Sequence, residues 1–130
     1  MIKEFSISTE KRYQLVNITD KIQEAVKESG VKEGLAFIFS LHTTAAILIN
    51  EDEENLNQDW LTALDQLTKN VELLHNKLDN NADAHIKAGL IGSGKAIAIK
   101  NNDLVLGNYQ SIFLAEFDGP RTRKVAVKII

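Results

Sequence analysis

The chain has 130 residues, which suits one domain and is short for two. Its 18 acidic residues outnumber 15 Lys and Arg, and a net charge of −3 argues against a nucleic-acid binder, which needs a basic face. The absence of cysteine excludes disulfides and thiolate sites. The first residues lack the apolar run of a secretory signal, and no segment approaches the roughly 20 apolar residues of a membrane helix, so we expect a cytoplasmic protein without membrane partners.

The first part of the chain is predicted to form four strands and one helix. Alternating apolar residues predict strands over residues 2–9 and 12–18. Residues 19–30 begin with capping residues, carry an apolar stripe at helical spacing and end on a glycine, which predicts a helix. Short apolar runs rich in β-branched and aromatic residues predict strands over residues 35–42 and 45–50.

The second part begins with a longer helix, predicted over residues 53–69. Its apolar side chains recur at intervals of three and four and form one stripe: Leu56, Trp60, Leu64 and Leu67. Beyond it, the pattern predicts a short helix over 82–92 and four strands over 95–100, 104–107, 111–117 and 124–130. The helices do not alternate regularly with the strands, so we predict one α+β domain over residues 1–130.

The three histidines stand at the expected edges of elements: His42, His75 and His85. Their spacings of 33 and 10 positions exclude a helical i,i+4 pair, and spacing alone therefore favours surface or capping roles. Element ends are nevertheless where rigid scaffolds carry functional side chains. Because imidazole is the commonest metal ligand, three of them with one open coordination position would form a Lewis-acid or hydrolytic site.

Two carboxylates have positions that suit a functional site. Glu51 directly follows a predicted strand and, with Asn50, could line a pocket near His42, whereas the acids after it are typical of a helix cap. If residues 35–42 and 45–50 pair as a hairpin, however, His42 and Glu51 lie at opposite ends. One long strand over residues 35–50, or a capping role for Glu51, would remove the conflict.

Glu116 lies within a nearly continuous apolar strand. A carboxylate there is costly unless it is exposed, paired or functional. Arg121 and Arg123 follow closely, and Arg is the natural bidentate partner of carboxylate or phosphate. The glycines Gly92 and Gly94 in IGSGKA are too closely spaced for a phosphate-binding P-loop and favour a helix stop instead.

Three segments together resemble the YjbQ-like family, also called secondary thiamine-phosphate synthases. HTTAAILINEDEE, NADAHIKAGLIGSG and LVLGNYQSIFLAEFDGPRTRKV occur in the family's order and at about its spacing, over nearly the whole chain. The resemblance implies a compact α+β domain with a large, mainly antiparallel sheet, assembled as a homotrimer with sites near subunit interfaces. The chain departs from the family at GNYQSI, where Tyr109 stands in place of a tryptophan.

The resemblance also implies a reaction that joins an aminopyrimidine diphosphate to a thiazole phosphate and releases pyrophosphate. It implies a divalent metal, zinc or magnesium, on the three histidines His42, His75 and His85. The catalytic residues would be His42, Glu51, His85 and Glu116. The substrate-binding residues would be Thr43, Asn50, Lys87, Gln110, Arg121 and Arg123. Two alternatives stay open: a His-metal-dependent hydrolase of a phosphorylated or amide substrate, and a non-catalytic metal or small-molecule binding trimer.

Overall fold

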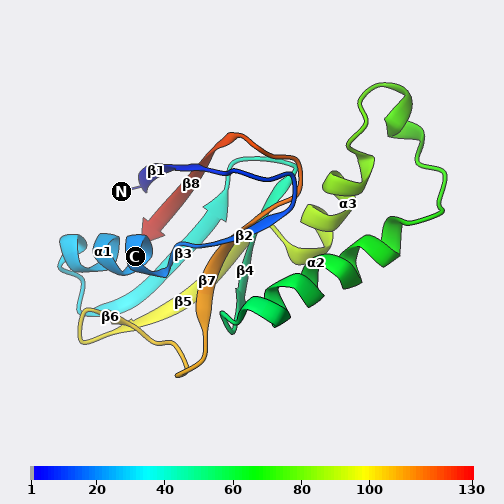
Figure 1. The fold of residues 1–130 in the computed structure, drawn as a ribbon. Helices are drawn as coiled ribbons and strands as arrows, with labels where there is room; N and C mark the ends of the chain where they lie inside the picture. Colours follow the sequence, from blue (N-terminus) through cyan, green and yellow to red (C-terminus); the bar gives the residue numbers. More distant parts are fainter. Residues whose placement is uncertain (1) are drawn as a thin grey trace.

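Two antiparallel sheets organise the protein, of which the computed structural model describes residues 2–130 (Figure 1). The five-stranded sheet has the order β1-β8-β3-β5-β6 and the three-stranded sheet the order β2-β7-β4. The strands are β1 (Ile2–Ser8), β2 (Gln14–Asn17), β3 (Glu33–Ser40), β4 (Ala45–Asn50), β5 (Gly94–Lys100), β6 (Asp103–Leu104), β7 (Ser111–Glu116) and β8 (Thr122–Ile129). The helices are α1 (Thr19–Ser29), α2 (Glu54–Thr68), a 3₁₀ helix η1 (Leu74–Lys77) and α3 (Ala82–Ile91). The predicted α+β class is confirmed.

The main core lies between the two sheets. Alternate residues of β3, β5 and β8 face inward from the larger sheet, and Ile47 and Leu114 face them from the smaller one. Helix α1 adds Ile22 and Val26 to the same core, as its predicted stripe requires. The outer face of the larger sheet stays open, and Phe37 is 42% exposed on it.

The three-stranded sheet is covered on both faces. Neighbouring residues of β7 point to opposite sides, so Leu114 enters the main core while Ala115 packs in a second cluster under α2 and α3. That double burial explains why β4 and β7 are apolar along nearly their whole length. It also places Glu116, at the end of β7, entirely inside the protein.

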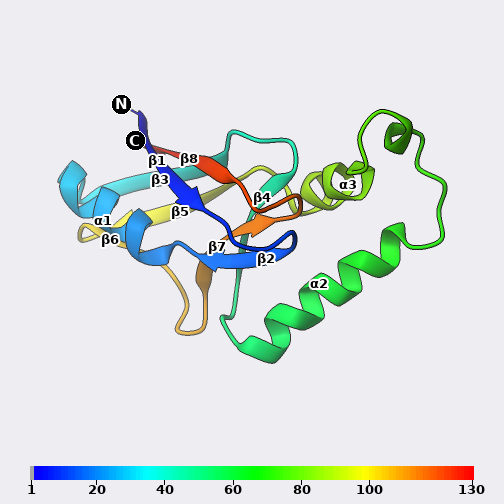
Figure 2. The ribbon, with the colours of Figure 1, turned by 45° about the horizontal axis from the view of Figure 1, so that its top comes forward.

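Helices α2 and α3, with η1 between them, extend to one side of the sheets (Figure 2). The Glu53 carboxylate caps α2 by accepting hydrogen bonds from the backbone N–H groups of Asn55 and Leu56, in agreement with the acidic start of the predicted helix. Leu64 is buried, but Leu67, predicted for the same stripe, is 60% exposed because the last turn of α2 runs beyond the sheet. The helix η1 was not predicted. Across residues 2–130, every helix falls short of the length and apolarity that crossing a bilayer would require.

Two sequence-based interpretations are wrong. Strands β3 and β4 form neither a hairpin nor one long strand, because β3 pairs with β5 and β8 whereas β4 pairs with β7. The burial patterns explain this: alternate β3 residues are exposed, as on a one-sided sheet, while β4 begins with four consecutive buried residues. The strand predicted over 104–107 is limited to Asp103–Leu104, because a tight turn from the N–H of Leu106 to the carbonyl of Leu104 ends the pairing.

Candidate active site

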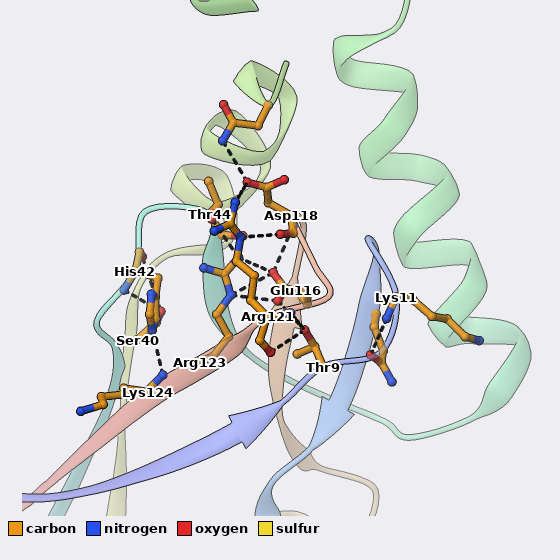
Figure 3. A network of polar contacts seen from close by, with 12 residues as sticks. Thr9, Lys11, Ser40, His42, Thr44, Glu116, Asp118, Arg121, Arg123 and Lys124 are labelled. Atoms are coloured by element: carbon orange, nitrogen blue, oxygen red, sulfur yellow. Dashed lines mark hydrogen bonds and ion pairs between the residues drawn. The ribbon is translucent and has the colours of Figure 1, made fainter. Parts of the chain in front are cut away.

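His42 lies in the four-residue turn that carries the chain from the larger sheet to the smaller one. Its ring Nε2 accepts a hydrogen bond from the backbone N–H of Lys124 at 2.7 Å, and its own backbone N–H donates to Ser40 Oγ at 3.2 Å (Figure 3). Pairing between β3 and β8 has just ended, at Ser40 and Val125. The half-buried imidazole therefore accepts the β8 hydrogen bond that a further residue of β3 would otherwise accept.

Helix α3 brings His85 to the same place from a distant part of the sequence. The two imidazoles line one open pocket of about 630 Å³. Its other lining residues are small, polar or short apolar side chains: Ser40, Leu41, Thr43, Ala45, Ala88, Gly89, Gly92 and Ser93. Gly92 ends α3 at φ +98°, which confirms the predicted helix stop and favours glycine at this wall of the pocket.

His75 contacts His85 but does not line the pocket. Their ring centroids are 4.8 Å apart in an edge-to-face arrangement. His75 is placed by η1, and its Nε2 lies 3.1 Å from Asn81 Oδ1, just before α3. His75 therefore lies behind His85, which forms part of the pocket wall.

The histidines of one chain do not complete the expected three-histidine metal site. Within residues 2–130, no group of three or more His, Asp or Glu side chains is arranged to hold a metal ion. His42 also has its Nε2 engaged with Lys124. A metal at this pocket would need ligands from a bound substrate or a second copy of the chain.

Glu116 and Arg123 form a buried ion pair beside the pocket rather than in it. Arg123 Nε donates to both oxygens of Glu116, at 2.8 and 3.0 Å, and Nη2 also contacts Oε2. Thr9 Oγ1 and the backbone N–H of Asp118 donate to the same carboxylate. Because both side chains are almost completely buried and are held together by these hydrogen bonds, the predicted carboxylate–Arg pairing is confirmed with Arg123 as the partner.

This ion pair fixes the turn that carries His42. Arg123 Nη2 donates to Thr44 Oγ1 at 2.8 Å, two residues after His42, while the backbone of Lys124 holds the imidazole itself (Figure 3). Two adjacent residues of β8 therefore clamp both sides of the turn. Glu116 does not line the pocket; it holds Arg123, which in turn holds Thr44 in the turn beside His42.

Arg121 lies at the exposed edge of the same network. Its guanidinium contacts Asp118 through the carbonyl at 2.8 Å and the carboxylate at 3.0 Å, and its side chain is 54% exposed. Of the two arginines predicted to bind phosphate, Arg121 is the one whose charge faces solvent.

The surroundings of His42 favour its neutral form. Burial first, and then the positive charges of Arg123 and Arg121, lower the pKa of His42 against the opposing charge of Glu116. The ordinary pKa of histidine already lies below neutrality, so the neutral form of the ring predominates at pH 7.

Lys87 lies on the opposite side of α3 from the pocket. Its ammonium donates to Asp83 at 2.9 Å and Asp65 at 3.0 Å, and lies 4.3 Å from the centre of the Tyr13 ring. Burial works against its charge, but hydrogen bonds with the two carboxylates outweigh that effect and raise the pKa of Lys87. Lys87 therefore joins α3 to α2 and to Tyr13, the residue just before β2, on the side of α3 away from the pocket.

Replacing Lys87 with methionine is expected to lower the free energy of unfolding by about 1.5–3 kcal/mol, since charge-assisted hydrogen bonds to Asp83 are lost in a mostly buried setting. Asp65→Asn is the matched control and should cost less than about 1 kcal/mol, because that carboxylate is half exposed. Urea unfolding measures both. Unchanged stability of Lys87→Met together with weaker substrate binding would contradict the structural role.

Asn50, Glu51 and Gln110 lie at the far end of β4 from His42. Six residues of strand separate the two ends, or about 20 Å. Asn50 pairs with Ser111 at the start of β7 and accepts the N–H of Glu51, and Gln110 accepts the N–H of Gly107. One chain therefore does not bring this group to the histidine pocket.

Sequence reasoning missed three features of the site. Ser40 and Ser93 line the pocket, and the backbone of Lys124 orients His42. Ser93 stands in the IGSG segment, where the glycines indicate a helix stop but the sequence does not show that the hydroxyl belongs to a pocket. Every residue except proline has a backbone N–H, so the sequence cannot indicate that the N–H of Lys124 is the one that binds His42.

Residues 3–130 match the family described as UPF0047 protein YjbQ-like. The chain belongs to this YjbQ/UPF0047 family. A UPF0047 protein of Methanocaldococcus jannaschii is 46% identical over 132 residues, which cover 100% of this chain and 94% of the relative.

Solved structures of family members have the same fold. A YbjQ-like protein of unknown function from Sulfolobus solfataricus is 39% identical, with a TM-score of 0.96, over 99% of this chain and 95% of its own. An uncharacterised family member from Clostridium acetobutylicum is 45% identical, with a TM-score of 0.94, over 98% and 99%. The names of these YjbQ/UPF0047 relatives give no enzymatic activity.

Proposed function

We propose that the protein is an enzyme that acts on a phosphorylated small molecule in the pocket of His42 and His85. The observation that carries the proposal is the convergence of these imidazoles, from two distant segments, on one open pocket with hydroxyls of Ser40, Thr43 and Ser93. Imidazole and hydroxyl groups can donate hydrogen bonds to phosphate oxygens, and an imidazole can also move a proton.

The family resemblance supports thiamine-phosphate synthesis as the reaction. The ring nitrogen of the thiazole phosphate would attack the methylene carbon of the aminopyrimidine diphosphate. The carbon–oxygen bond would break, and pyrophosphate would leave with the bonding electrons. Hydrogen bonds from His42 and the pocket hydroxyls would stabilise the charge that develops on the leaving oxygens. His85 would transfer a proton to the departing group.

The experiment is to incubate the purified protein with both substrates and magnesium and to measure thiamine phosphate and pyrophosphate together. Equal amounts of the two products are expected. A parallel panel of phosphate esters and amides, with added zinc, tests for hydrolysis. No turnover in either assay, despite stoichiometric binding of a ligand, would favour a non-catalytic binding protein.

A metal-dependent hydrolase is the second candidate, favoured by the contact between His75 and His85. We propose zinc or magnesium as the ion, with the missing ligands supplied from outside the single chain. Elemental analysis of protein prepared without a histidine tag or chelators tests this. Near-stoichiometric metal that is lost in both His75→Ala and His85→Ala would support the candidate, and metal-free active protein would eliminate it.

We propose that the site works in a homotrimer. Two separate apolar surfaces are exposed: the outer sheet face around Leu35 and Phe37, and the extended segment with Leu67, Leu74 and Leu78. Two different surfaces that bind each other produce head-to-tail association, which forms a ring when the rotation from one copy to the next closes on itself. Such a ring could also bring the Glu51 end of one chain to the histidines of another.

Phe37→Glu is expected to dissociate the assembly, because it places a charge in the centre of the outer sheet face. Light scattering after size-exclusion chromatography should give the mass of one chain for this variant and of three for the unaltered protein. Lys21→Glu, on the exposed surface of α1, is the control and should leave the mass unchanged. A trimer that survives Phe37→Glu would rule out this face.

A further inference from the structure

The two ring nitrogens of His42 are in different situations. Nε2 lies 2.7 Å from the backbone nitrogen of Lys124, and that nitrogen is the donor. A neutral imidazole has one N–H and one lone pair. The lone pair must therefore be on Nε2, which leaves the proton on Nδ1.

The position of Lys124 in β8 keeps the proton of His42 on Nδ1. The N–H of Leu41 donates to the carbonyl of Lys124, after which β3 turns away and leaves the N–H of Lys124 without a strand partner. His42 is the acceptor that satisfies it. Both the other tautomer and the imidazolium ion would place two hydrogens between the same two nitrogens. The lowered pKa of His42, due to burial and to Arg123 and Arg121 against Glu116, acts in the same direction.

The Nδ1 side of the ring is open. No side-chain hydrogen bond involves Nδ1 anywhere in residues 2–130, and Nδ1 is not among the buried polar atoms that lack a partner, which are Asn57 Oδ1 and Trp60 Nε1. Because His42 also lines the pocket, its free N–H is available to a ligand there.

We propose that His42 is a fixed, neutral hydrogen-bond donor whose Nδ1–H contacts a phosphate oxygen of the substrate. The choice of a phosphate as the ligand of His42 rests on the proposed function. His42 is then neither the general base nor a metal ligand, because Nε2 is occupied and Nδ1 already carries a proton. His85 has no side-chain hydrogen bond within the described part of the chain, so proton transfer falls to His85.

The tautomer can be measured on the whole ¹⁵N-labelled protein without any ligand. Long-range ¹H–¹⁵N correlation spectra at pH 7 should show His42 protonated at Nδ1 and unprotonated at Nε2. A scalar coupling across the hydrogen bond should connect the amide nitrogen of Lys124 to His42 Nε2. A proton on Nε2, or an imidazolium ion at this pH, would overturn the proposal whatever the protein's substrate is.

Two substitutions then test the ligand contact, with inorganic phosphate as the probe. The amide nitrogen in His42→Asn lies near the position of Nδ1, whereas that in His42→Gln lies near Nε2. Phosphate affinity should stay within about threefold for His42→Asn and fall about 10- to 100-fold for His42→Gln, the loss expected for a hydrogen bond to a charged group.

Lys124→Ala is the control, since it keeps the backbone N–H and removes only an exposed side chain, and it should bind phosphate with no more than a small loss. Equal losses in the Asn and Gln variants, or the reverse order, would overturn the donor role. If the unaltered protein binds no phosphate, the ligand assignment and the proposed function both fail, while the spectra still decide the tautomer.

Discussion

Replacing Glu116 with alanine is expected to lower the free energy of unfolding by about 3–5 kcal/mol. The substitution leaves the Arg123 guanidinium buried without its counter-charge, and it removes the acceptor of Thr9 and of the Asp118 backbone. An uncompensated buried charge is far more costly than a missing surface pair. Urea unfolding followed by circular dichroism measures the loss.

Two control variants test whether the loss of stability comes from the uncompensated charge of Arg123 or from any substitution among these hydrogen-bonded residues. Arg121→Ala removes the exposed cation at its edge and should cost less than about 1 kcal/mol. The double variant Glu116→Leu with Arg123→Met removes both charges and should recover much of the stability lost by Glu116→Ala. Loss of activity in Glu116→Ala at unchanged stability would contradict the structural role and return Glu116 to direct catalysis.

The second large effect concerns the two pocket histidines. His42→Ala and His85→Ala are each expected to reduce turnover by about 100-fold or more, because one removes a donor to the leaving group and the other a proton-transfer group. The double variant should lose little more than the worse single variant, as is usual for residues that act as a unit. Thiamine phosphate formation in each variant is the measurement.

Lys100→Ala, at the far end of β5 and exposed, is the matched control and should keep full turnover. The mass in solution of the histidine variants should equal that of the unaltered protein, which shows that assembly is intact. Full turnover in His42→Ala and His85→Ala would remove the pocket from the mechanism. A loss in Glu51→Gln as well would indicate that a second copy supplies this residue.

Much of the fold could be predicted because local pattern and tertiary packing agree. The stripe in residues 19–30 is the face that α1 buries, and Glu53 caps α2 where acids precede the apolar period. The Glu116 pairing was predictable for a similar reason: a carboxylate in a strand buried on both faces requires a nearby cation, and Arg123 is the one that reaches it.

The arrangement of the site was harder to predict, because it depends on contacts between distant segments. Adjacent strands 35–42 and 45–50 suggested a hairpin, but strands of different burial belong to different sheets, and the turn between them carries His42 to β8. Lys87 is only two positions from His85, yet a rotation of about 200° around α3 places it on the opposite side. The resemblance groups Lys87 with the substrate-binding residues, but it does not indicate which side of α3 the side chain occupies.

The central claim is that the pocket of His42 and His85 holds the substrate. Titration of the ¹⁵N-labelled protein with thiamine phosphate, and separately with pyrophosphate, tests it most directly. The account predicts saturable shifts of the resonances of His42, His85 and Gly89, with little change at Lys87. Shifts confined to the Asn50 end of β4 with none at the histidines, or no saturable shift with either compound, would contradict it.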